Sequence, residues 1–139
     1  MNVVDLFSGV GGFSAGLKKA GFNIISANEI DGQIADSYKK NHPKTKMVVS
    51  DISDFIKQIK LEGDNNTKKI DLVVGGPPCQ GFSMAGARIR KNAFIDDPRN
   101  YLFKKYFNVI QQLEPNYFIM ENVSGLASMK NGAILKEIE

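Results

Sequence analysis

Residues 3–12, Val-Val-Asp-Leu-Phe-Ser-Gly-Val-Gly-Gly, join a short apolar run to a glycine-rich loop. The run from 3 to 7 has the length and composition of a buried β-strand. Apolar residues then recur at helical spacing, as at Phe13 and Leu17, until Gly21 ends the helix. A strand, a loop and a helix in this order begin an alternation that continues along the chain.

Four further strands are predicted, at residues 23–27, 47–49, 71–74 and 117–120. The segments between them carry helical patterns, including a helix that starts at Asp97-Pro98 and a last one that Asn131 caps. Strands that alternate with helices form a parallel sheet with right-handed crossovers. We therefore predict one α/β domain over residues 1–139, with a doubly wound, mainly parallel sheet that is truncated after its fifth strand.

Unusual residues follow each predicted strand. The strand ends read FSGVGG (7–12), NEID (28–31), SDI (50–52), GGPPCQ (75–80) and ENV (121–123). In open α/β sheets, ligands bind outside the carboxyl ends of the strands. The sequence therefore predicts a binding site at this edge of the sheet.

The glycine loop does not match the common phosphate-binding patterns. The dinucleotide pattern G-x-G-x-x-G would need glycine where Ser14 stands, and the Gly-Lys-Ser/Thr of a P-loop is absent. Glu29 could accept hydrogen bonds from two ribose hydroxyls, Asp51 could accept one from an adenine amino group, and a helix N-terminus attracts a carboxylate. A ribose, an adenine and an amino-acid carboxylate together describe S-adenosylmethionine. Alternatively, the glycines only relax helix–strand packing and Glu29 is a surface acid.

Cys79 is the only cysteine of the chain, and His42 is the only histidine. They cannot supply the four nitrogen or sulfur ligands that a zinc site usually needs, so no metal is expected. His42 lies beside Pro43 at a helix end and is predicted to be at the surface. A lone cysteine after an apolar strand is either a small buried residue or a nucleophile.

The bulk composition indicates a globular protein of a reducing compartment. Net charge is +3, 42% of the residues are hydrophobic, and a single cysteine cannot form an internal disulfide. The sequence contains no apolar run of membrane-spanning length, and its first residues lack the layout of a signal peptide. We expect a cytoplasmic protein without membrane contact. The basic residues between 87 and 100 form either a phosphate-contacting loop or a solvated one.

Five stretches together resemble the ordered motifs of cytosine-5 DNA methyltransferases. They are DLFSGVGGF (5–13), NEID (28–31), SDI (50–52), GPPCQGFS (76–83) and ENV (121–123). The resemblance covers the chain from Asp5 to Val123. It implies a Rossmann-like methyltransferase fold and methyl transfer from S-adenosylmethionine to carbon 5 of cytosine in double-stranded DNA, with S-adenosylhomocysteine as product.

The resemblance also implies roles for individual residues. Cys79 would attack carbon 6 of a flipped cytosine, Glu121 would hydrogen-bond ring nitrogen 3, and Asn122 would order the loop. The implied cofactor pocket consists of Phe7, Ser8, Gly9, Val10, Gly11, Gly12, Glu29, Ile30, Asp51, Ile52, Gly76, Pro78 and Leu102. The implied DNA-contact residues are Gln80, Ser83, Arg88, Arg90, Lys91 and Arg99.

The family pattern extends further than this sequence, into a later arginine motif, a target recognition domain and a C-terminal motif. We therefore expect little or no activity from this chain alone. A second chain that carries the other motifs, or self-association through an unpaired sheet edge, would complete it. Two alternatives remain open: a tRNA cytosine-5 methyltransferase, and a non-catalytic cofactor-binding module. If the substrate is DNA, the protein acts on the nucleoid of a prokaryote and belongs with restriction-modification enzymes.

Overall fold

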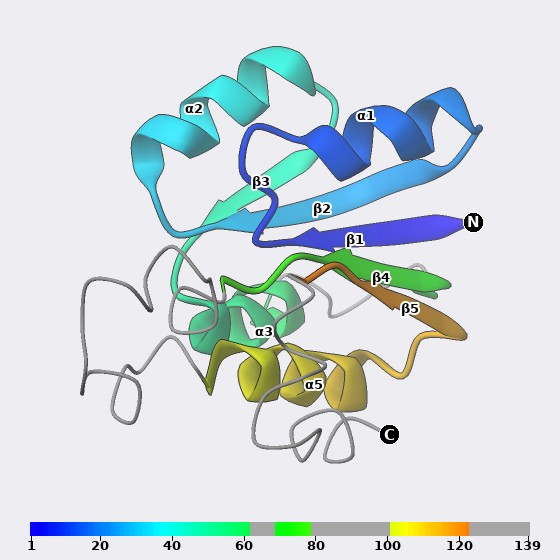
Figure 1. Cartoon of the computed structure of the whole chain (residues 1–139), viewed down its shortest axis with the longest axis vertical. Helices are drawn as coiled ribbons and strands as arrows, with labels where there is room; N and C mark the ends of the chain where they lie inside the picture. Colours follow the sequence, from blue (N-terminus) through cyan, green and yellow to red (C-terminus); the bar gives the residue numbers. More distant parts are fainter. Residues whose placement is uncertain (62–68, 79–100, 123–139) are drawn as a thin grey trace, which may run out of the picture.

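The computed structural model of the chain describes residues 1–61, 69–78 and 101–122, which Figure 1 draws in colour. The strands are β1 (Asn2–Leu6), β2 (Asn23–Glu29), β3 (Lys46–Val49), β4 (Leu72–Gly75) and β5 (Tyr117–Met120). The helices are α1 (Gly12–Lys19), α2 (Gly32–Asn41), α3 (Ile52–Leu61) and α5 (Leu102–Leu113). In the part of the chain that the structure describes, no helix meets the length and apolarity of a membrane span.

The five strands form one parallel sheet in the order β3-β2-β1-β4-β5. α1 and α2 cover one face of the sheet, and α3 and α5 cover the other (Figure 1). The predicted doubly wound α/β architecture is therefore confirmed. The order changes direction at β1, which pairs with both β2 and β4. Such a switch point is where sheets of this kind open to a ligand.

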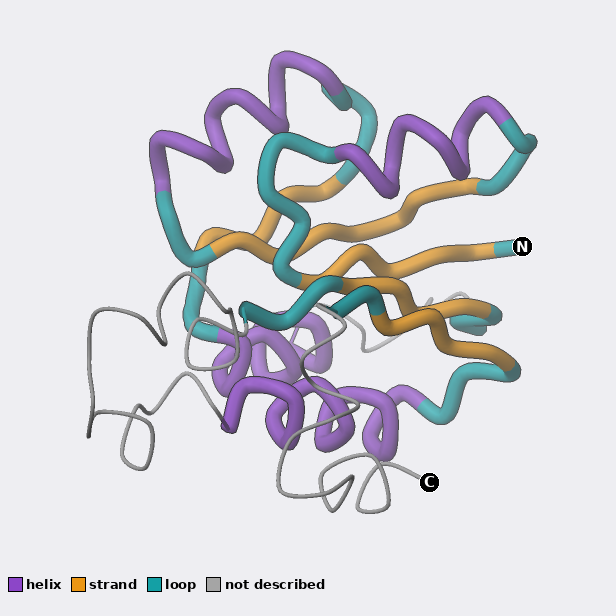
Figure 2. The backbone as a smooth tube through the Cα atoms, in the orientation of Figure 1, coloured by secondary structure: helices purple, strands orange, loops and turns teal. Residues whose placement is uncertain are grey.

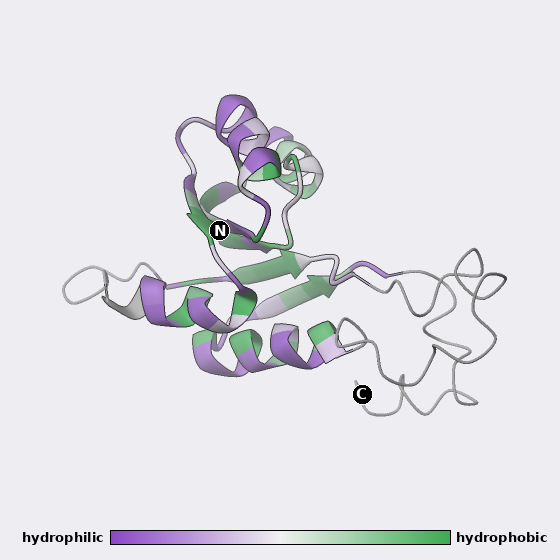
Figure 3. Ribbon diagram, turned by 90° about the vertical axis from the view of Figure 1, so that its left-hand side faces the viewer, coloured by the Kyte–Doolittle hydropathy of each residue, from purple (hydrophilic) through white to green (hydrophobic). Residues whose placement is uncertain are grey.

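Side chains of β1 alternate between the two faces, as the pleat of a strand requires. Val4 and Leu6 belong to the larger apolar cluster, which α3 and α5 cover with Phe55, Tyr106 and other residues. Val3 belongs to a smaller cluster that Phe13 and Leu17 of α1 cover. Figure 3 shows this hydrophobic layer between the helices. The core thus holds the carboxyl ends of β1 and β4 in fixed positions.

Four of the five strands differ from their predicted bounds: β1 and β4 shift by one residue, β3 begins one residue earlier, and β2 is longer. β2 runs to Glu29, two residues beyond the prediction, because its end still pairs with β3. α5 buries a single stripe of Phe103, Tyr106 and Val109, and the last two belong to the apolar cluster shared with the sheet and α3. The predicted helix start at 97–98 and the predicted last helix after 131 lie outside the described residues. Figure 2 shows the loops that follow β1, β2 and β4 at one edge of the sheet.

Candidate functional site

The glycine loop lies between β1 and α1 and has a tightly folded backbone. Phe7, Gly9 and Gly11 have positive φ angles of 52°, 56° and 96°. A positive φ is uncommon for a residue other than glycine, so Phe7 carries local strain. Within the loop, the Gly11 amide donates to the Ser8 carbonyl at 2.9 Å. The Ser8 amide donates to the carbonyl of Asn28 at 3.0 Å, which ties the loop to the end of β2.

Glu29, the last residue of β2, strengthens this connection. Its Oε2 accepts the Gly9 amide at 3.0 Å, and its Oε1 accepts the amides of Ile30 and Asp31 at 2.9 and 3.0 Å. An ionised carboxylate offers about four acceptor positions, so these bonds leave about one, on Oε2. The Val10 and Ile30 side chains near this carboxylate are 55% and 67% exposed. The strand end therefore presents one open acceptor, and exposed apolar residues occupy positions 10 and 30, next in sequence to amides that bind this carboxylate.

Asp51 follows β3 and begins α3. Its Oδ1 accepts the Ser53 amide at 2.7 Å, and Lys105 lies 3.2 Å from Oδ1 and 3.4 Å from Oδ2. The hydrogen bonds from Ser53, and then the Lys105 ammonium, lower the pKa of Asp51. The carboxylate is therefore ionised and can only accept hydrogen bonds at neutral pH.

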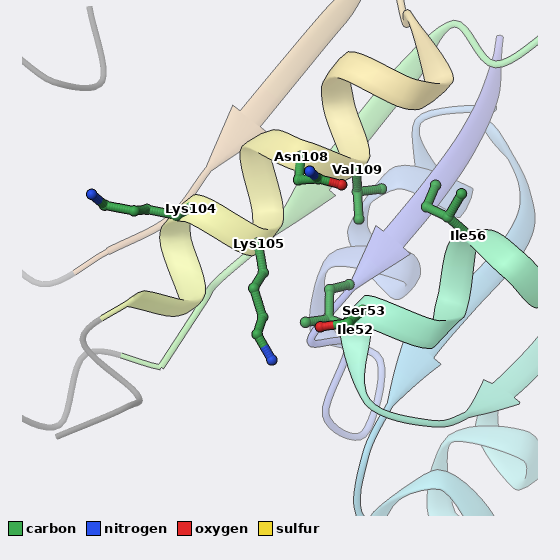
Figure 4. A pocket seen from close by; sticks show the side chains of 7 residues that line it. All are labelled: Ile52, Ser53, Ile56, Lys104, Lys105, Asn108 and Val109. Atoms are coloured by element: carbon green, nitrogen blue, oxygen red, sulfur yellow. The ribbon is translucent and has the colours of Figure 1, made fainter.

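A cavity of about 320 Å³ lies between α3 and α5, next to this carboxylate. Its lining consists of Ile52, Ser53, Ile56, Lys104, Lys105, Asn108 and Val109 (Figure 4). In Figure 4, Lys104 points away from the other lining side chains, while Lys105 extends beside Ile52 and Ser53. Lys105 thus borders the cavity and binds Asp51 at the same time. Leu102 of the predicted pocket is half-buried at the start of α5.

The segments after β4 and β5 lie side by side. The Glu121 amide donates to the Gly75 carbonyl at 2.9 Å, and Asn122 Nδ2 lies 3.4 Å from the Pro77 carbonyl. A β-carbon placed on Gly76 would lie 2.8 Å from Glu121 Oε2, so only glycine leaves the carboxylate where it is. Pro77 is buried and Pro78 is exposed. These contacts fix the backbone that leads directly into position 79.

Several predicted site residues lie outside the described parts of the chain. They are Cys79 and the six DNA-contact candidates Gln80, Ser83, Arg88, Arg90, Lys91 and Arg99. The predicted cofactor-pocket residues all lie within the described parts, after β1, β2, β3 and β4 and at the start of α5. Among the residues with described positions, no group of three or more His, Cys, Asp or Glu side chains could hold a metal ion.

The surface prediction for His42 is wrong. Its side chain is only 5% exposed, because the end of α2 packs against the glycine loop. His42 Nε2 lies 3.0 Å from the Gly11 carbonyl, and the ring packs against the buried Tyr38 with the centroids 4.6 Å apart and the planes tilted by 49°. Sequence reasoning also assigned no role to Tyr38, whose hydroxyl lies 2.6 Å from Ser14 Oγ. The contact of His42 with Gly11 and that of Tyr38 with Ser14 have no local sequence signal, since each joins residues more than 20 positions apart.

Comparison with known proteins identifies the family. The sequence model described as C-5 cytosine-specific DNA methylase matches residues 1–139. The chain belongs to this family of DNA methylases. It is 42% identical over 143 residues to the Type II methyltransferase M1.HphI of Haemophilus parahaemolyticus, covering 99% of this chain and 36% of that protein. It is 44% identical over 135 residues to M.NgoPII of Neisseria gonorrhoeae, covering 96% of this chain and 37% of the relative.

Solved structures agree with this membership of the DNA methylase family. One, described as a DNA modification methyltransferase encoded within a prophage (E. coli), aligns with a TM-score of 0.78 and 36% identity. The alignment covers 99% of this chain and 36% of that one. The predicted Rossmann-like methyltransferase fold is therefore confirmed. The chain spans about a third of the length of these relatives.

Proposed function

We propose that this chain binds S-adenosylmethionine and carries the nucleophile of a DNA cytosine-5 methyltransferase. One observation carries the proposal. In this member of the methylase family, one edge of the sheet carries the glycine loop, Glu29, Asp51 and Glu121, each at the carboxyl end of a parallel strand. This edge offers carboxylate acceptors for a nucleoside and backbone N–H donors for a carboxylate, next to the segment that leads to Cys79.

The residues of this edge fit the proposed cofactor. The remaining acceptor position on Glu29 Oε2 can take one ribose hydroxyl, and a second hydroxyl would have to share a position with a backbone amide. Ionised Asp51 suits an adenine amino group, because that group only donates. The exposed Val10 and Ile30 can cover apolar faces of the ligand. The amides at the start of α1 can bind its carboxylate. When bound, the cofactor supplies an electrophilic methyl group on its sulfonium.

The chain's own residues would activate the cytosine. The Cys79 thiolate forms a bond to carbon 6, while Glu121 supports the charge that develops at nitrogen 3 by hydrogen bonding or protonation. Carbon 5, now enamine-like, would take the methyl group from the sulfonium, and the broken S–C bond would leave S-adenosylhomocysteine. A base then removes the proton from carbon 5, and the bond between Cys79 and carbon 6 breaks to release methylcytosine and thiolate. The contacts of Glu121 and Asn122 with residues 75–77 support this arrangement, since they hold both catalytic segments together.

The proposed substrate is double-stranded DNA in the cytoplasm of a prokaryote, with the target base flipped out of the duplex. The basic residues Arg88, Arg90, Lys91 and Arg99 would then contact phosphates, and Gln80 and Ser83 would contact the DNA near the base. Binding should weaken steeply with salt, because phosphate contacts release counterions.

We further propose that the outer edge of β5 is a protein contact, either with a second polypeptide or with a second copy of this chain. Tyr117, Phe118 and Ile119 of β5 are between 47% and 63% exposed. Among the described strands, β5 pairs only with β4, so its outer edge is a candidate contact surface.

A covalent trapping experiment tests the proposed function. Duplex DNA that contains 5-fluorocytosine is incubated with the chain and S-adenosylmethionine, and adducts are separated on a denaturing gel. Fluorine at carbon 5 blocks the final elimination, so even a single slow turnover by a weakly active chain should leave an adduct, which should disappear in Cys79→Ser. An adduct that persists in Cys79→Ser would refute the role of Cys79. A preference for tRNA over DNA in competition would favour an RNA methyltransferase.

Cofactor binding is tested separately by calorimetry with S-adenosylhomocysteine, which needs no DNA. We expect saturable binding to the 139-residue chain with one site. Binding without any adduct would favour the non-catalytic module, whereas absence of binding would contradict the proposed cofactor site.

A further inference from the structure

The glycine loop is also held from behind, by residues at the end of α2 that face away from the proposed cofactor. Asn41 Nδ2 donates to the Val10 carbonyl at 2.9 Å. The next carbonyl, that of Gly11, accepts the Ala15 amide at 2.9 Å and lies 3.0 Å from His42 Nε2. Two successive carbonyls of the loop therefore point towards α2.

The partners of His42 define its protonation state. A carbonyl can only accept, so Nε2 must carry a hydrogen to bond with Gly11. The other ring nitrogen, Nδ1, lies 3.1 Å from Lys18 Nζ, which only donates, so Nδ1 must be an unprotonated acceptor. Lys18 also donates to Thr45 Oγ1 at 2.9 Å. The network therefore selects the neutral imidazole with hydrogen on Nε2.

The hydrogen bond from His42 fixes the orientation of one peptide group. A trans peptide points its N–H away from its carbonyl. With the Gly11 carbonyl directed to His42 and α1, the Gly12 N–H must lie at the open N-terminus of α1. A β-carbon on Gly11 would overlap the His42 ring, so ring and loop are fitted to each other. Rotation of this peptide would remove the Gly12 donor from the edge where the cofactor is proposed to bind.

We propose that His42 is a positioning residue for the methyl donor: it holds the Gly11–Gly12 peptide so that the Gly12 N–H meets the carboxylate of S-adenosylmethionine. The inference rests on the proposed function. His42 acts entirely through the loop, from the side opposite to the ligand. It belongs to no motif of the methylase resemblance, and its role comes from the contact between α2 and the loop.

Two substitutions of His42 test the roles of the two ring nitrogens separately. The Nε2 of glutamine can reach the place of His42 Nε2, so His42→Gln keeps a donor for Gly11 but loses the acceptor for Lys18. Asparagine reaches only the place of Nδ1, so His42→Asn keeps the acceptor and loses the donor. Both variants lose the aromatic ring that packs at an angle against Tyr38, and asparagine is smaller than glutamine by one methylene, so the stability of each variant must be compared as well.

The test compares the dissociation constants of S-adenosylhomocysteine for the unaltered chain and both variants by calorimetry, with thermal stability measured in parallel. His42→Asn should weaken binding about tenfold, the usual effect of one lost buried hydrogen bond, while His42→Gln should stay within about threefold. Equal affinities for the two variants, or affinities that follow stability alone, would overturn the positioning role. A failure of the unaltered chain to bind would instead overturn the proposed cofactor site and this inference with it.

Nitrogen chemical shifts of the His42 ring give a second readout that does not involve the cofactor. The network requires hydrogen on Nε2 and a bare Nδ1 in the free chain. A ring that is protonated on Nδ1 at neutral pH would refute the assignment, whether or not the chain binds S-adenosylhomocysteine.

Discussion

Asp5 lies in the middle of β1 with its side chain fully buried. Its Oδ2 accepts the Ser14 hydroxyl at 2.6 Å, but Oδ1 has no hydrogen-bond partner among the described residues. Burial raises the pKa of Asp5 from 3.8 to about 6, and the hydrogen bonds from Ser14 only partly oppose this effect. Ionisation of Asp5 at neutral pH therefore destabilises the native protein.

The sign of the pH dependence follows from proton binding. Between pH 3.8 and about 6, the folded chain keeps a proton on Asp5 that the unfolded chain has already lost. Stability from this group is therefore highest below 3.8 and falls as the pH rises to about 6. At about 1.36 kcal/mol per pH unit, the whole change is about 3 kcal/mol, of which about 2 kcal/mol falls between pH 4.5 and pH 7.

The variant Asp5→Asn removes this titration and keeps the size of the side chain. We expect the free energy of unfolding of Asp5→Asn, minus that of the unaltered chain, to increase by about 2 kcal/mol from pH 4.5 to pH 7. Urea unfolding followed by circular dichroism at both pH values gives the two differences. Asp36→Asn, on the exposed side of α2, controls for the loss of one surface carboxylate. A difference that does not change with pH would refute the buried, partly unpaired carboxylate.

Three further predictions concern the cofactor edge, measured by calorimetry with S-adenosylhomocysteine and by thermal unfolding. Glu29→Gln should weaken binding at least tenfold and cost about 1–2 kcal/mol of stability, because an amide cannot replace all three backbone bonds; unchanged affinity would contradict the ribose role. Asp51→Asn should weaken binding about tenfold. Lys105→Met removes only a half-exposed ion pair, so it should change the stability by less than about 1 kcal/mol and the affinity by less than about threefold. Gly75→Ala should be far more destabilising than Gly76→Ala. A β-carbon at position 75 would lie 2.6 Å from the backbone carbonyl oxygen of Leu6, which cannot move, whereas one at position 76 would meet the Glu121 carboxylate, which can. Equal melting temperatures of the two variants would disprove this.

The sequence predicted those parts of the fold that depend on local pattern. Each short apolar run became a strand, and the polar residues after it came to one edge because all the strands are parallel. Glu29 and Asp51 were predicted for this reason. The number of open positions on Glu29 was not predictable, since it depends on how the backbone of residues 9, 30 and 31 turns around the carboxylate.

Contacts between helices were the part that the sequence did not reveal. His42 sits beside a proline at the end of a helix, a setting typical of exposed residues. Its burial follows only from the packing of α2 and α1 on the same face of the sheet, which brings residues 11 and 42 together. Lys18 escaped notice for the same reason, because its partners lie at the far end of α2 and just beyond it.

Ser14 connects these observations. It occupies the place of the third glycine in a dinucleotide-binding loop, where glycine would allow close helix–strand packing. Burial raises the pKa of Tyr38 to about 12, so Tyr38 keeps its proton and donates to Ser14, which in turn donates to Asp5. Substitution of Ser14 by glycine would therefore break a buried chain of hydrogen bonds that joins β1, α1 and α2. The serine that argued against a pyrophosphate site in the sequence thus also stabilises the fold, because it links the strand and the two helices that hold the glycine loop.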